Sequence, residues 1–131
     1  MDKSLLVKSG HALVDLLEAN GVRPSAAMWV RGADIDAWRL WIVPPENFQD
    51  KRDFYRRVSE IVSNNPDRFQ GFDASYVEMV SSGHPAVSAL RRMFRVEGQG
   101  DVSIQSNMLN GFYLPDGIIL RMDFEQVKRV G

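Results

Sequence analysis

The residues that could carry acid–base or metal chemistry are few in this chain and stand far apart. Its two histidines are His11 and His84, and neither has a second ligand at the spacing that protein metal sites use. Pro85 follows His84, and proline is favoured at the first position of a helix, so we interpret His84 as the residue that begins a helix. The pattern therefore identifies no catalytic residue, no metal ligand and no cofactor.

Two groups of carboxylates keep metal-dependent chemistry open as an alternative. Asp34 and Asp36 lie in one predicted turn and could hold a divalent cation together, although a solvated turn is the favoured interpretation. Asp116, Glu125 and Lys128 follow the order of acid, acid and lysine found in metal-dependent nucleases, but the last spacing is one residue too long. A metal-dependent hydrolase or nuclease is thus the alternative function.

Five arginines are candidates for binding an anion. They stand in two groups, each on a predicted helix: Arg56 and Arg57, then Arg91, Arg92 and Arg95. If both helices packed on one face of a sheet, these side chains would form one basic patch for an anion, a nucleic-acid backbone or an acidic partner. The net charge of the chain is -1, which disfavours nucleic acid and favours a solvated helix face as the interpretation.

Trp29, Arg39 and Trp41 are candidates for a partner surface. In the predicted strand that ends at Val43, Trp38 lies on one face, and Arg39 and Trp41 lie on the other. A sheet with helices on one side leaves its second face open, and tryptophan and arginine are frequent at interface centres. We therefore expect Trp38 in the core. A partner or a second copy should contact Arg39 and Trp41. It should also contact Trp29 if the register of the hairpin places Trp29 on the same face.

Alternating helical and extended patterns predict the elements that position these residues. They are a helix over 4–19, a hairpin over 26–43, a helix over 49–63, a strand over 75–80, a helix over 85–94 and strands over 101–122. Asn110-Gly111 marks the turn between the last strands. The order α-β-β-α-β-α-β-β predicts an α+β fold with a mostly antiparallel sheet of about five strands and about three helices on one face.

Composition limits the class of protein. The 131 residues fit a single domain over 1–131, with 122–131 as a frayed tail, and 44% of them are hydrophobic, which is enough for a packed core. The chain has no cysteine, which excludes disulfides and thiolate catalysis. Charged residues such as Asp2, Lys3 and Lys8 interrupt the N-terminal apolar run, so we expect a cytoplasmic protein without a signal peptide or membrane span.

Several short landmarks resemble, in their order, a family of small uncharacterised bacterial proteins. They are Trp38-Arg39-Leu40, Tyr55-Arg56-Arg57, His84-Pro85, Ala89-Leu90-Arg91, Asn110-Gly111, Asp116 and Arg121. The similarity covers roughly residues 27 to 122. It implies a common fold and brings no catalytic residue with it.

These observations together predict a soluble bacterial protein that acts as a non-enzymatic interaction or binding module. Its partner is expected to be a protein, either a different one or a second copy of the same chain in a homodimer. The metal-dependent hydrolase or nuclease is the first alternative, and a nucleic-acid-binding protein is the second.

Overall fold

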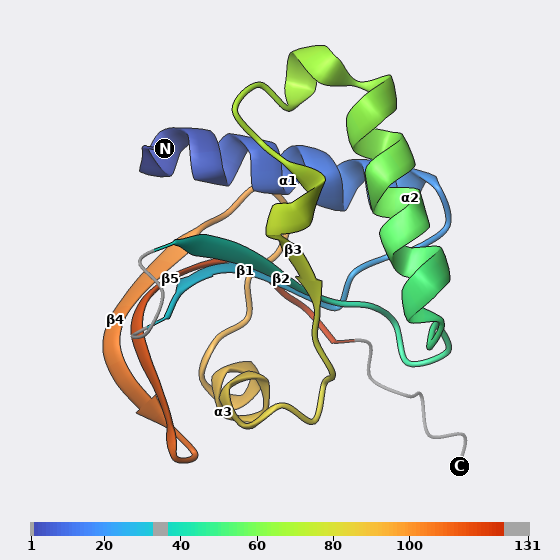
Figure 1. Cartoon of the computed structure of the whole chain (residues 1–131). Helices are drawn as coiled ribbons and strands as arrows, with labels where there is room; N and C mark the ends of the chain where they lie inside the picture. Colours follow the sequence, from blue (N-terminus) through green and yellow to red (C-terminus); the bar gives the residue numbers. More distant parts are fainter. Residues whose placement is uncertain (1, 33–36, 125–131) are drawn as a thin grey trace.

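The computed structural model describes residues 2–32 and 37–124 (Figure 1). The elements are α1 (Lys3–Ala19), β1 (Ala26–Arg31), β2 (Trp38–Val43), α2 (Lys51–Asn64), β3 (Val77–Met79), α3 (Pro85–Met93), β4 (Val102–Leu109) and β5 (Phe112–Met122). Two short 3₁₀ helices, Pro66–Arg68 and Ala74–Tyr76, lie between α2 and β3. This order confirms the predicted one, and no helix of the described ranges is long and apolar enough to cross a membrane.

Side-chain caps explain where the helices begin. The Asp2 carboxylate accepts a hydrogen bond from Leu5 N (2.9 Å), and the Asp50 carboxylate accepts one from Asp53 N (3.1 Å). Such caps satisfy amide groups that have no partner within the helix. His84 does the same for α3, since its Nδ1 lies 3.1 Å from the amide nitrogen of Ala86. The prediction that His84 begins a helix is therefore confirmed.

The five strands form one sheet in the order β3-β2-β1-β5-β4. Only β2 and β3 run parallel, so the predicted mostly antiparallel sheet is confirmed. The turn between β4 and β5 is formed by Asn110 and Gly111, whose φ angles of 50° and 83° are both positive. Two successive positive φ angles are what a tight two-residue hairpin requires, and Asn-Gly is the sequence that adopts them most readily.

The helices cover both faces of the sheet, which corrects the prediction that all of them lie on one face. Figure 1 shows α1 and α2 on one side of the sheet and α3 on the other. The cause is visible in β1, where every residue from Ala26 to Val30 is buried. Alternate residues of a strand point to opposite faces, so a strand buried throughout must be covered on both.

Two cores result, one on each face. The α1-side core contains Trp29 and Leu40 of the sheet, and it is closed by Leu6, Leu13, Leu17, Phe54 and Val58 of α1 and α2. The α3-side core contains Met28, Trp41 and Ile119 of the sheet, and it is closed by Ala86, Val87 and Leu90 of α3. Each helix thus stabilises the fold mainly by burying one apolar stripe against the shared sheet.

Candidate anion-binding cleft

The predicted partner surface of Trp29, Arg39 and Trp41 is not an exposed aromatic face. Trp29 has no exposed area and Trp41 is 8% exposed, whereas Arg39 is exposed. Trp41 lies beneath α3, where its ring packs against His84 and its Nε1 donates to a carboxylate oxygen of Glu78 (3.1 Å). The prediction of an open aromatic face is wrong because α3 covers the face of the sheet that carries Trp41.

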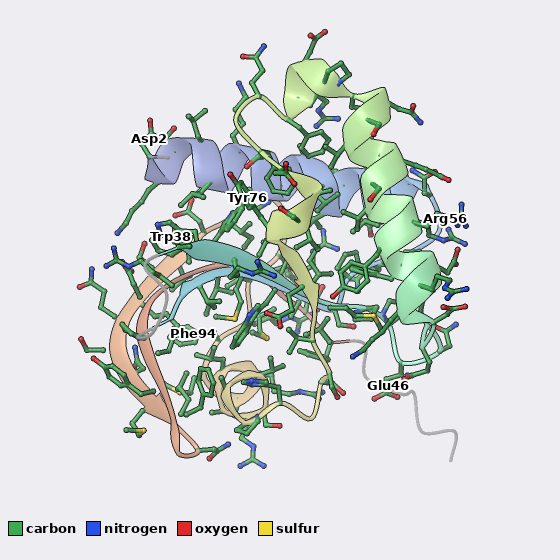
Figure 2. The ribbon with its side chains drawn as sticks, in the orientation of Figure 1. Asp2, Trp38, Glu46, Arg56, Tyr76 and Phe94 are labelled. Atoms are coloured by element: carbon green, nitrogen blue, oxygen red, sulfur yellow. The ribbon has the colours of Figure 1, made fainter. Side chains whose placement is uncertain are left out.

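Trp38 lies at the margin of the sheet. The prediction placed it in the core, and it packs half-buried against the α1-side core with the Arg31 guanidinium carbon 5.7 Å from its ring centroid. Figure 2 shows Trp38 on the same side of the sheet as α1, while Arg56 points outward from α2.

The five candidate arginines do not form one basic patch. Arg56 and Arg57 belong to α2, whereas Arg91, Arg92 and Arg95 belong to α3 and the residues after it, on the other face of the sheet. On α2, Asp53 lies one turn before Arg56 and Arg57 and forms ion pairs with both. Hydrogen bonds from Arg56 and then Arg57 hold the pKa of Asp53 below its usual range. Arg56 is also paired with Glu60 (2.8 Å), so these charges are largely balanced within α2.

A cleft forms where the end of α3 meets the end of β5. Its volume is about 450 Å³. The lining residues are Arg23, Arg91, Phe94, Arg95, Met122, Asp123 and Phe124. Two of the five predicted arginines, Arg91 and Arg95, therefore meet a third, Arg23, that the sequence pattern did not single out.

The backbone brings Arg23 and Asp123 together although they are a hundred positions apart. The Asp123 amide donates to the carbonyl of Ser25 (2.8 Å), which extends the pairing between β5 and β1 by one step. Arg23 Nη2 then lies 2.8 Å from Asp123 Oδ2. This juxtaposition follows from the antiparallel register of β1 and β5, so no local sequence signal would have found it.

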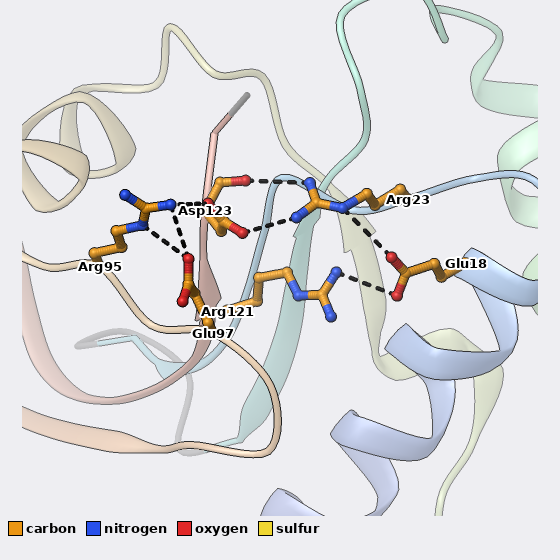
Figure 3. Close-up of polar contacts among 6 residues, drawn as sticks. All are labelled: Glu18, Arg23, Arg95, Glu97, Arg121 and Asp123. Atoms are coloured by element: carbon orange, nitrogen blue, oxygen red, sulfur yellow. Dashed lines mark hydrogen bonds and ion pairs between the residues drawn. The ribbon is translucent and has the colours of Figure 1, made fainter. Parts of the chain in front are cut away.

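Asp123 lies between two guanidinium groups (Figure 3). Besides its contact with Arg23, it lies 3.5 Å from Arg95 Nη2, while Arg95 makes a shorter ion pair of 2.8 Å with Glu97. Arg23 Nε also lies 3.4 Å from the carboxylate of Glu18 at the end of α1. The long Arg95–Asp123 contact is weak, because Arg95 is 72% exposed and solvent screens it.

Arg121 adds a buried positive charge to this network. Its side chain is 8% exposed, and its Nη1 lies 3.5 Å from the Glu18 carboxylate and forms no hydrogen bond within the described part of the chain. Among the described residues, four guanidinium groups (Arg23, Arg91, Arg95 and Arg121) stand near three carboxylates (Glu18, Glu97 and Asp123), and Arg91 forms no ion pair with any of the three. A guanidinium in this position favours an anionic ligand at this end of the molecule.

Part of the cleft lining is apolar. Phe94 and Phe124 are half-buried, Met122 is buried, and the Arg91 guanidinium carbon lies 3.8 Å from the centroid of the Phe124 ring. Stacking on an aromatic ring fixes the plane of a guanidinium and leaves its edge free to donate. Among the described residues, no carboxylate lies within ion-pair distance of Arg91. The cleft therefore combines donors for a carboxylate or phosphate with surface for an apolar group.

The remaining candidates do not gather around one reactive centre. His11 is buried in α1 with its Nε2 2.9 Å from the Gly100 carbonyl. Burial lowers the pKa of His84, and the charge of Glu78 acts in the opposite direction. In the ranges that the structure covers, no three His, Asp or Glu side chains are grouped so that they could hold a metal ion.

Of the residues that the sequence suggested for metal chemistry, Asp116 is among the described residues. Asp116 lies buried on β5, where its Oδ2 is 3.5 Å from Arg31 Nη2. Asp34, Asp36, Glu125 and Lys128 lie outside the described residues. Comparison of the chain with protein-family models, with curated proteins and with solved structures gave no match.

Proposed function

We propose that this protein is a binding module whose cleft receives an acidic, partly apolar segment of a partner protein. One observation carries the proposal: Arg23 and the pair Arg91 and Arg95, from two distant parts of the chain, converge on one open cleft that two phenylalanines also line. Guanidinium groups bind carboxylates with two parallel hydrogen bonds, and nearby apolar surface adds binding energy from neighbouring side chains.

Arg91 is the group on which an incoming carboxylate would first bind. It is exposed, stacked on Phe124 and not engaged by a carboxylate of the described chain. Arg95 would follow, because its 3.5 Å contact with Asp123 is long enough to be exchanged for a ligand oxygen. Arg23 holds Asp123 in place at 2.8 Å and so shapes the wall of the cleft.

The distribution of charge favours a protein segment over a nucleic acid. The described residues at this end include four guanidinium groups and three carboxylates, and the whole chain carries -1. Nucleic acids are held by many phosphate contacts and need a wide basic surface. A ligand with one or two carboxylates beside an apolar side chain matches the cleft in both charge and surface.

The test uses a blocked synthetic peptide in which glutamate and leucine alternate, titrated into isotope-labelled protein and followed by NMR. We expect the side-chain Nε–Hε signals of Arg91 and Arg95 and the amide of Phe124 to move. A peptide with glutamine in place of glutamate should leave them unmoved. Arg91→Gln should weaken binding about tenfold, the value of one lost charge-assisted hydrogen-bonded pair. Arg56→Gln on α2 is the matched control and should bind as the wild type does.

Three results would overturn the proposal. They are signals that stay still with the glutamate peptide, equal binding of both peptides, and equal weakening by Arg56→Gln. A single-stranded oligonucleotide that binds the cleft while the peptide does not would move the protein to the nucleic-acid class. Binding of Mg²⁺ or Mn²⁺ that shifts carboxylate signals and accelerates hydrolysis of a phosphodiester would favour the metal-dependent alternative.

A further inference from the structure

The sheet has two edges of very different length. β3 at one edge has three residues, whereas β4 at the other has eight. Figure 1 shows no described helix or strand against the outer side of β4. An edge strand presents a row of backbone donors and acceptors to solvent, and long edges are therefore the places where further strands add.

β4 lacks most of the features that keep edge strands from pairing. Its sequence from Val102 to Leu109 contains no charged residue and no proline. Ser106, with φ at 51°, has no partner on β5, and the pairing continues in the same register from Asn107, so the interruption lies in the second half of β4. The first half, Val102–Gln105, pairs with β5 without interruption, so its outer backbone groups form the regular part of this edge.

Exposed apolar side chains lie next to this edge. Met108 of β4 is 67% exposed, and Tyr113, its partner across β5, is 47% exposed. They are two of the five large hydrophobic side chains that the described surface exposes most. A strand added to β4 would shield them from water in part, which adds a hydrophobic contribution to the backbone hydrogen bonds.

We propose that β4 pairs antiparallel with β4 of a second copy of this chain and joins the two sheets across a two-fold axis. Charge is the reason for choosing a second copy. A two-fold axis at the centre of Val102–Gln105 would pair Val102 of one copy with Gln105 of the other and Ser103 with Ile104, so a charged residue in this short segment would lie close to a like charge. β4 has none, and the net charge of -1 gives two copies little long-range repulsion.

The dimer proposal does not depend on the arginine cleft, so either proposal can be refuted while the other holds. Sedimentation equilibrium of the wild-type protein over a wide concentration series should show a mass that rises from 14.9 kDa toward twice that value. Ser103 is exposed in the regular half of β4. Ser103→Lys places two ammonium groups near each other across the axis and should raise the dimer dissociation constant about tenfold or more.

Ser63→Lys is the matched control, because Ser63 is an exposed serine on α2, away from the edge. It should dimerise as the wild type does. Hydrogen exchange of the wild type provides a test without substitution: amides of β4 should exchange more slowly at high protein concentration, and those of β3 should not change. A monomer at every concentration, a dimer unaffected by Ser103→Lys, or equal weakening by Ser63→Lys would each overturn the proposal.

Discussion

At the scale of single residues, Gly10 sets how closely α1 approaches the sheet. A Cβ atom at this position would lie 2.2 Å from Leu120 Cδ1 and 2.9 Å from Trp29 Nε1. The indole of Trp29 needs that proximity, since its Nε1 donates to the carbonyl of Leu6 at 2.6 Å. A glycine inside a helix is unfavourable by itself, so here close packing outweighs helix propensity.

We therefore expect Gly10→Ala to destabilise the protein, although alanine is the better helix former. Propensity would contribute up to about 1 kcal/mol in favour of alanine, while overpacking of a close contact costs typically about 1–3 kcal/mol. Urea unfolding should show a lower midpoint with an unchanged slope. Ser59→Ala, on the exposed face of α2, is the control and should change the midpoint little. A Gly10→Ala protein as stable as the wild type would refute the close-packing account.

At the scale of elements, the short helix α3 both covers one face of the sheet and contributes a residue to the cleft. Its apolar stripe of Ala86, Val87 and Leu90 covers the second face of the sheet. Its last turn carries Arg91 to the cleft. The helix has nine residues, so it depends on tertiary packing and on its cap, and His84 supplies that cap through an unprotonated Nδ1.

Stability should therefore fall as the pH drops below the ordinary range of histidine. Burial lowers the pKa of His84 in the folded state below the ordinary histidine value of 6.5. The unfolded chain then takes up a proton before the folded one does. The contribution of neutral His84 is complete above pH 6.5 and is lost as the pH falls from there through the lower folded pKa. Protonation also removes the acceptor that caps Ala86.

The measurement is the free energy of unfolding of the wild type and of His84→Asn as a function of pH. Asparagine can cap a helix at any pH in this range. The wild type should lose stability relative to the variant as the pH falls below 6.5. A difference that does not change with pH would show that His84 titrates alike in both states.

At the scale of the whole molecule, one sheet serves two cores. β1 contributes Trp29 to the α1-side core and Met28 to the α3-side core. Unfolding of either helical layer would expose apolar residues of strands that both cores share. The charged network of Figure 3 also links the end of α1 with the end of β5 through Glu18 and Arg121.

We expect one cooperative unfolding transition for this reason. Trp29 lies in one core and Trp41 in the other, so tryptophan fluorescence reports on both cores. If both cores unfold together, the urea curves from fluorescence and from far-ultraviolet circular dichroism should coincide. The amide exchange rates of α1 and α3 should also rise together as urea is added. Separate midpoints, or early exchange of α3 alone, would show that the α3 layer unfolds independently.

Local sequence patterns determined the elements and their order. Helix periodicity, the His84-Pro85 helix start and the Asn110-Gly111 turn each depend on interactions within a few residues, and all were confirmed. The sequence also predicted the α+β class and the mostly antiparallel sheet. Arg91 and Arg95, two of the cleft arginines, were recognised as basic residues at the end of a helix.

Only the tertiary structure decided which face each helix covers and which distant residues meet. The placement of α3 on the second face buried Trp41 and separated Arg56 and Arg57 from Arg91. The register between β1 and β5 brought Arg23 to Asp123. These outcomes depend on contacts between segments far apart in the chain, and their energies become defined only when the whole core is packed.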